Sequence, residues 1–297
     1  MKKENSHNYL LSCFLRYVYC RPCDLASFKS IRNCAKDIEE ERIDGLINNA
    51  GIMYAPRQIT EDGFEVHWSV NHLGPYLLTR LLTEKLIGGR ILYMINLDYR
   101  SAKQGLLFDD LNLSKKYDKK YAFYQSQLAN VLTIQRLAQE LKEHSISVNA
   151  INPGNCKDTN IKRYVLSHNF KNQAFYVNSK DVLINQLWCF RYMGVEKSWF
   201  AMIGSKLVMS FLEKKPEEGA YTALFMALDR SVTGITGKCF FNMSEMSFVD
   251  VPGTPEDAKR LMAIDDYWSG LKSKEEVLSE QKLPAPNDAK VKNETGS

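Results

Sequence analysis

Hydrophobic residues along the chain form short apolar runs that alternate with longer stretches of helical spacing. Leu46 and Ile47 predict a short, buried parallel strand. A helix is expected ahead of this strand, with Ser27 as its N-cap. Its inward stripe consists of Phe28, Ile31, Cys34, Ala35 and Ile38. The alternation of strand and helix predicts an α/β fold that is built on a parallel sheet.

The same alternation continues to about residue 271. Further helices are expected over residues 64–86, 119–143 and 254–271, and another begins at Pro216. Strands are expected over residues 16–20, 90–95, 145–151 and 237–241. We therefore predict one domain over residues 1–271, followed by a polar, disordered tail over residues 272–297. Residues 160–215 carry many aromatic side chains, which are compatible with a helical pair that closes the core.

Composition limits the functions that this domain performs. A net charge of +4 is too small to predict nucleic-acid binding. The seven cysteines form no disulfide pattern, which predicts a reducing compartment. Cys20 and Cys23 form an isolated pair without a second pair or a histidine cluster, so no metal site is predicted. The apolar stretch over residues 9–20 is too short to span a bilayer, and we predict a cytoplasmic protein, or one peripheral to an intracellular membrane.

The turn after the strand at Leu46 is the most informative motif. Asn48-Asn49-Ala50-Gly51 combines small residues with a glycine, which lets the backbone approach a ligand closely. About twenty residues later comes Val70-Asn71-His72-Leu73-Gly74. Together the two stretches resemble the short-chain dehydrogenase/reductase superfamily, in its branch of retinol-dehydrogenase-like proteins and the WW-domain-containing oxidoreductase.

This resemblance implies a fold, a cofactor and a reaction. The fold is a Rossmann-like, doubly wound parallel sheet, the cofactor is NAD(P), and the reaction interconverts an alcohol and a carbonyl of a retinoid-like or steroid-like substrate. The resemblance also implies that the aromatic residues over 160–215 form a substrate lid, suited to long apolar substrates. The choice between NAD and NADP depends on family positions that have no match in this chain. The cofactor-side positions that the chain does match are Asp24, Asn48, Asn49, Ala50, Gly51, Pro153 and Gly154.

Active relatives use an Asn, a Ser, a Tyr and a Lys four residues after the Tyr. The Asn is retained as Asn71, whereas Asn96 stands at the position of the Ser. Phe123 and Gln127 stand at the positions of the Tyr and the Lys. That register is fixed by matches at Ala122, Ser126, Leu128, Ala129 and Asn130. Tyr124 is the nearest candidate to replace the missing phenol, although it is turned by about 100° around the helix axis.

The chain also departs from the family before the first matched motif. Family members begin with a glycine-rich turn that holds the cofactor pyrophosphate, but the first glycine of this chain is Gly45. We therefore predict an N-terminally truncated fold that lacks the first two βα units, with weakened cofactor binding. The strand at Leu46 would then have an uncovered edge, through which the chain could associate.

Three functions remain open at this stage. The first is a pseudoenzyme that has lost turnover, because three of the four catalytic groups are replaced. The second is an oxidoreductase with an altered active site that uses Tyr124 or Asn96. The third is a module that binds an apolar small molecule or a protein through residues 160–215.

Overall fold

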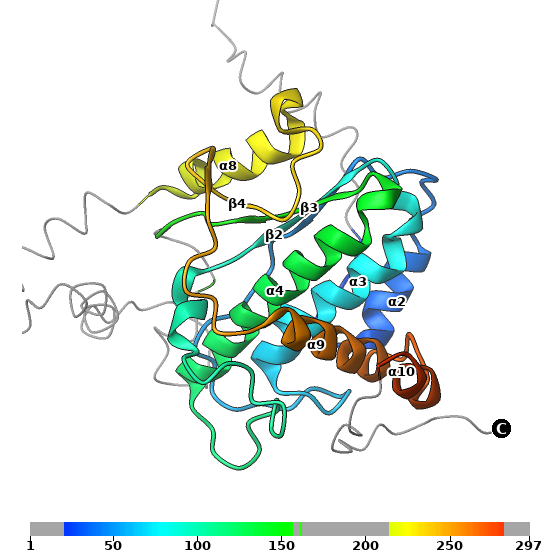
Figure 1. Ribbon diagram of the computed structural model, residues 1–297, viewed down its shortest axis with the longest axis vertical. Helices are drawn as coiled ribbons and strands as arrows, with labels where there is room; N and C mark the ends of the chain where they lie inside the picture. Colours follow the sequence, from blue (N-terminus) through cyan, green and yellow to red (C-terminus); the bar gives the residue numbers. More distant parts are fainter. Residues whose placement is uncertain (1–20, 157–160, 162–213, 282–297) are drawn as a thin grey trace, which may run out of the picture.

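The computed structural model describes residues 21–156, 161 and 214–281, and its centre is a five-stranded sheet (Figure 1). The strands lie side by side in chain order: β1 (Gly45–Asn48), β2 (Arg90–Met94), β3 (Ser147–Ile151), β4 (Cys239–Phe241) and β5 (Ser244–Met246). The first four strands are parallel, and β5 is antiparallel to β4. The predicted α/β fold with a mostly parallel sheet is therefore confirmed.

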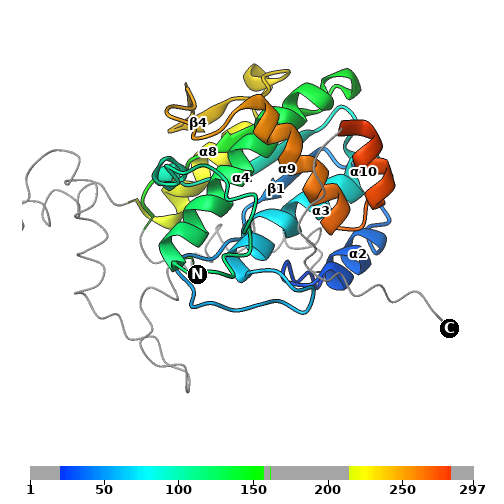
Figure 2. The same ribbon diagram turned by 60° about the horizontal axis from the view of Figure 1, so that its bottom comes forward.

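Helices cover both faces of this sheet. Figure 1 shows α2 (Phe28–Lys36), α3 (Gly74–Leu82) and α4 (Lys119–Glu140) on one face and α8 (Pro216–Leu228) on the other. The turned view in Figure 2 places α9 (Pro255–Trp268) alongside α4, with α10 (Lys274–Gln281) next to α9. Because α4 lies between the sheet and α9, its residues are buried on nearly every side.

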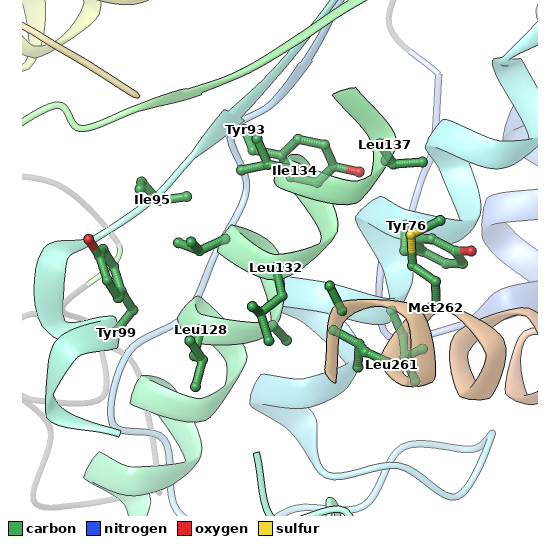
Figure 3. Packing of buried hydrophobic residues seen from close by; sticks show 14 of the residues in the cluster. Tyr76, Tyr93, Ile95, Tyr99, Leu128, Leu132, Ile134, Leu137, Leu261 and Met262 are labelled. Carbon is green, nitrogen blue, oxygen red and sulfur yellow. The ribbon is translucent and has the colours of Figure 1, made fainter. Parts of the chain in front are cut away.

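The main hydrophobic core fills the space between the sheet and the helices α3, α4 and α9. Figure 3 shows part of it, with Tyr93 from β2, Ile134 from α4 and Leu261 from α9. A second, smaller cluster lies between the sheet and α8, where Leu92 and Phe240 contact Met226. The strand at Leu92 therefore contributes alternate side chains to the two cores, as a strand covered on both faces does.

β1 lies at the edge of the described sheet, with β2 as its neighbour. In the register of these strands Ile47 pairs with Leu92 and faces the α8 side. Leu92 is fully buried, whereas Ile47 is 39% exposed. The strand expected over residues 16–20 lies outside the described residues, so the open edge is a property of the part of the chain that the structure describes.

The continuous helix expected over residues 64–86 is interrupted. A π-helical segment, Trp68–Leu73, precedes α3, and a 3₁₀ turn, Glu84–Leu86, follows it. Pro75 explains the interruption, because it has no N–H to donate to the carbonyl of Asn71 four residues earlier. The backbone N–H of Gly74 bonds instead to the carbonyl of Ser69, five residues earlier.

The tail predicted to be disordered from residue 272 is helical over Lys274–Gln281, so that prediction is wrong for these residues. Ser273 and Glu276 form a reciprocal cap, in which each side chain accepts a hydrogen bond from the backbone N–H of the other residue. Val277 is buried, and α10 packs against α9. A local cap and one buried side chain therefore order a sequence that is otherwise polar.

Candidate functional site

The carboxyl end of β2 brings two of the predicted catalytic positions into contact. Asn96 follows the strand and caps the 3₁₀ turn Leu97–Ser101, where its Oδ1 accepts a hydrogen bond from the backbone N–H of Asp98 at 2.8 Å. The backbone N–H of Asn96 donates to Oε1 of Gln127, also at 2.8 Å. Gln127 comes from α4 and is almost fully buried. The Gln127 amide therefore holds the end of β2 to α4, and the Asn96 amide caps the turn that follows the strand.

Asn71 is the retained member of the predicted catalytic set, and its side chain hydrogen-bonds to the backbone of the loop after β1. Its Oδ1 accepts from the backbone N–H of Ile52 at 2.8 Å, and its Nδ2 donates to the Ile52 carbonyl at 3.0 Å. The same Nδ2 lies 3.0 Å from Oγ of Ser126, to which it donates. All of these groups are buried, so the Asn71 side chain fastens the loop to α4.

The backbone carbonyl of Asn71, left without a partner by Pro75, accepts a hydrogen bond from Nδ2 of Asn130 at 2.8 Å. Oδ1 of Asn130 then faces Nδ1 of His72 at 3.1 Å, which makes Nδ1 the donor. Nε2 of His72 lies 2.9 Å from Oδ2 of Asp265 in α9. Burial raises the pKa of Asp265, and the adjacent imidazole offsets part of that rise.

Phe123 lies at the position of the family's catalytic phenol and is completely buried. Its ring meets the ring of Tyr54 edge to face, with centroids 5.5 Å apart. On another side lies the imidazole of His67, whose centroid is 6.4 Å away. A phenyl group without a proton to exchange therefore stands at this position, packed between other rings.

Tyr54, whose ring packs on Phe123, carries an exchangeable hydroxyl that the sequence did not identify. Its hydroxyl donates weakly to Oδ2 of Asp98, 3.5 Å away. Burial, the charge of Asp98 and hydrogen bonding with Tyr124 all raise the pKa of Tyr54 well above its ordinary value. Burial also raises the pKa values of Tyr124 and Asp98. Tyr124, the predicted rescue candidate, thus belongs to a cluster of a carboxyl and two phenols.

His67 is a second buried histidine that the sequence did not single out. Its Nε2 accepts from the backbone N–H of Ala55 at 3.0 Å, which leaves Nδ1 to donate to Oε1 of Glu65 at 2.8 Å. The Tyr117 hydroxyl donates to the Ala55 carbonyl at 2.9 Å. Because both ring nitrogens are engaged in these bonds, His67 holds the loop after β1 in place.

The predicted cofactor-side residues around β1 are divided between the core and the surface. Nδ2 of Asn48 donates to Oγ1 of Thr79 at 3.0 Å, inside the protein. Asn49 and Ala50 are exposed, and Gly51 is half-buried. Asp24 is exposed and accepts a hydrogen bond from a backbone N–H two residues later, as in an Asx turn. Asn48 therefore has a structural role in the core, whereas Asn49 and Ala50 lie at the surface.

The side-chain ammonium of Lys214 lies at the turn formed by Pro153 and Gly154. Gly154 has a φ of +80°, which favours glycine, and its N–H donates to Oδ1 of Asn152 at 3.0 Å. Nζ of Lys214 donates to the Pro153 carbonyl at 3.2 Å. The same ammonium lies 4.5 Å from the centroid of the Phe241 ring. Sequence reasoning did not anticipate this contact, because Lys214 is about sixty residues away along the chain.

The residues present do not reproduce the contacts by which the family holds a nicotinamide dinucleotide. The position of the ribose-binding ammonium holds Gln127, whose oxygen is bonded to the backbone of Asn96. No glycine precedes Gly45, so the described residues ahead of β1 contain no glycine-rich phosphate turn. We therefore derive no chemical step through this cofactor.

The described part of the chain shows neither a metal-ligand cluster nor a membrane-spanning helix. Within it, no three or more His, Cys, Asp or Glu side chains gather as metal ligands would. Among the same residues, no helix is both long and apolar enough to cross a membrane. The aromatic segment over residues 160–215, which carried the hypotheses of a lid and of a binding module, lies almost entirely outside the described residues.

Comparison with known proteins agrees with the fold and the motifs. The family model described as enoyl-(acyl carrier protein) reductase matches residues 12–179. Human retinol dehydrogenase 13 is 35% identical over 272 residues, which cover 90% of this chain and 73% of that protein. Human retinol dehydrogenase 14 is 32% identical over 254 residues, which cover 84% and 66% of the two chains.

A solved structure of an uncharacterized protein from Mycobacterium paratuberculosis has the same fold, with a TM-score of 0.55. It is 22% identical to this chain, and the match covers 84% of this chain and 74% of the other. The matched motifs, the parallel sheet and the relatives thus agree with one another. The chain belongs to the short-chain dehydrogenase/reductase superfamily and is a retinol-dehydrogenase-like member of it.

Proposed function

We propose that this chain is a catalytically inactive member of the superfamily, which keeps the fold of NAD(P)-dependent oxidoreductases without interconverting alcohols and carbonyls. The observation that carries the proposal is the 2.8 Å hydrogen bond from the backbone N–H of Asn96 to Oε1 of Gln127. In relatives this position supplies an ammonium that binds ribose and lowers the pKa of the catalytic phenol. A neutral amide that is already bonded to the backbone does neither.

The position of the phenol supports the same proposal. Phe123 has no acidic proton, and its ring is fully buried against Tyr54. Loss of a positioned acid or base lowers a rate by about 10²–10⁴-fold. The replaced activating group reduces the rate further, although such losses need not multiply.

The test is an activity assay combined with a binding measurement. The purified chain is incubated with NADPH and all-trans-retinal, and NADPH is titrated into the chain in a calorimeter. We expect no turnover above the protein-free rate and no saturable heat. Saturable reduction of the retinal would overturn the proposal. The matched variant Asn96→Ser/Phe123→Tyr/Gln127→Lys restores the family groups, and a gain of NADPH binding by it would assign the defect to these three positions.

The cluster of Tyr54, Asp98 and Tyr124 favours one alternative, an oxidoreductase with an altered active site. A hydroxyl that hydrogen-bonds beside a carboxyl can donate a proton to a carbonyl oxygen. Because the charge of Asp98 raises the pKa of Tyr54, these phenols stay protonated and would act as acids in reduction, not as bases in oxidation. If the chain does reduce a carbonyl, Tyr124→Phe should lower that rate at least tenfold, and an unchanged rate would exclude Tyr124 as the acid.

A further inference from the structure

The segment before α2 lies along that helix in an extended conformation. Nε of Arg21 donates to the backbone carbonyl of Asp37 at 3.0 Å, and the backbone N–H of Asp24 donates to Oγ of Ser30 at 2.9 Å. From Arg21 to Asp24 the chain advances by three residues, while its partners go back from Asp37 to Ser30, so the segment runs antiparallel to α2. The two lengths agree, because three residues of extended chain and seven residues of helix each span about 10 Å. The partners on α2 lie seven residues apart, and Cys34 lies on the same face between them.

Cys23 and Cys34 are neighbours where the segment crosses this face. The flanking bonds of Arg21 to Asp37 and of Asp24 to Ser30 hold Cys23 over the face of α2 that carries Cys34. Cys34 is buried, whereas Cys23 is half-buried and remains within reach of solvent. Burial and the neighbouring Cys34 raise the pKa of Cys23 to about 12. Two reduced thiols from separate elements thus lie next to each other, and one of them is accessible to a small reagent.

We propose that Cys23 and Cys34 form a redox-active dithiol, which small-molecule disulfides such as oxidised glutathione convert to an intramolecular disulfide. Cys23 loses its proton to solvent, and its sulfur attacks one sulfur of oxidised glutathione and expels one glutathione thiolate. Cys34 then loses its proton and attacks the mixed disulfide at the Cys23 sulfur, which expels the second glutathione. Two protein thiols and one disulfide become one protein disulfide and two glutathione thiols, so atoms and electrons balance.

The bond would close a loop of about ten residues and would restrict the unfolded chain. It would also fix the segment that meets the start of α3. The carbonyl of Leu25 accepts a hydrogen bond from Oγ of Ser69 at 3.4 Å. The same carbonyl approaches Gly74 so closely that a Cβ there would lie 2.5 Å from it. The oxidised protein should therefore melt several degrees higher than the reduced protein.

The experiment treats the folded full chain with oxidised glutathione at mildly alkaline pH, measures the mass of the intact chain, and then blocks the remaining thiols before digestion. We expect a decrease of about 2 Da, from the loss of two hydrogen atoms. Tryptic digestion locates the bond. Because Arg21 precedes Pro22, trypsin leaves residues 17–29 as one peptide that carries Cys20 and Cys23. Cys34 is released on the separate peptide 33–36, and we expect these two peptides to be linked.

Matched variants assign the link to its two sulfurs. In Cys20→Ser the linked peptides should persist. In Cys34→Ser they should disappear, and Cys23 should keep one glutathione as a stable mixed disulfide. Cys239 is deeply buried in β4, out of reach of the reagent, whereas Cys23 is half-buried, so Cys239 should stay reduced and serve as the internal control. Absence of the link in the folded wild-type chain, or its loss in Cys20→Ser, would overturn the proposal.

Discussion

Two pairs of residues on α4 show what this chain has kept and what it has lost. Ser126 and Asn130 lie one turn apart, and both bind the retained Asn71 through buried hydrogen bonds. Phe123 and Gln127 lie one turn apart in the same way, but they differ from the Tyr and Lys of active relatives. The pair that joins elements of the fold matches the family, whereas the pair that would act on substrate and cofactor does not. The residues that maintain the fold and the residues at the family's catalytic positions are therefore separate sets on one helix.

The largest expected effect is on the structural side of this comparison. Asn71→Ala removes the side chain that bonds to the buried N–H and carbonyl of Ile52, and it leaves the Ser126 hydroxyl with only its bond to the Phe123 carbonyl. We expect the free energy of unfolding, measured in urea, to fall by about 3 kcal/mol. Asn49→Ala, at an exposed position of the neighbouring motif, should change it by less than about 0.5 kcal/mol. Similar losses in the two variants would remove the distinction.

A second prediction tests whether the position of the phenol still accepts one. Phe123→Tyr places a hydroxyl where the native ring is completely buried. We expect a loss of about 2 kcal/mol in unfolding free energy, because the hydroxyl is desolvated among aromatic rings. The comparison variant is Phe123→Tyr/Gln127→Lys, which restores the family pair. If the lysine recovers most of the loss, the surroundings still fit the family pair, and the two regions differ less than we infer.

The third prediction concerns the hydrogen bond that carries the proposed function. Gln127→Met keeps most of the side-chain volume but removes the acceptor for the backbone N–H of Asn96. We expect the free energy of unfolding, measured in urea, to fall by about 1 to 2 kcal/mol. Gln127→Ala should lower the free energy of unfolding somewhat more than Gln127→Met does, because it also leaves a cavity. An unchanged stability in Gln127→Met would mean that the amide is not needed at the end of β2.

The sequence predicted strands β1 to β4 and most of the described helices because their signals are local. The apolar run at Leu46 and the cap at Thr254 both lie where they were expected, in β1 and at the start of α9. The π-helix before α3 was missed, because its cause is one proline whose effect depends on the partner carbonyl. The hairpin between β4 and β5 was also missed. Its turn residues Asn242 and Met243 both have positive φ, which methionine seldom adopts.

Matching α4 to the family motif predicted the positions of the candidate site, but it did not predict which contacts these residues make. Matching along α4 located Gln127 and Phe123, but no pattern in the sequence indicates that Gln127 binds the backbone of Asn96. Tyr54 and Asp98 were overlooked, because they come from two different loops and meet only in the folded chain. Such long-range contacts leave no periodic signal along the sequence.

The smallest predicted effect tests the carboxyl of that overlooked cluster. Burial raises the pKa of Asp98 above its value in the unfolded chain, so the native state favours the protonated carboxyl. Its contribution to stability is therefore complete below the unfolded pKa of about 4 and is lost as pH rises through the raised native value. Asp98→Asn mimics the protonated form and should raise the unfolding free energy at pH 7.5 by about 1 kcal/mol.

The same substitution should have little effect near pH 3.5, where the native carboxyl is already protonated. Urea unfolding at the two pH values measures the difference, and Asp109→Asn, at an exposed position, is the matched control. A loss of stability at pH 7.5 would mean that the carboxylate is a net stabilising acceptor for Tyr54. The cluster would then tolerate a charge beside its phenols, which is the condition that an altered active site would need.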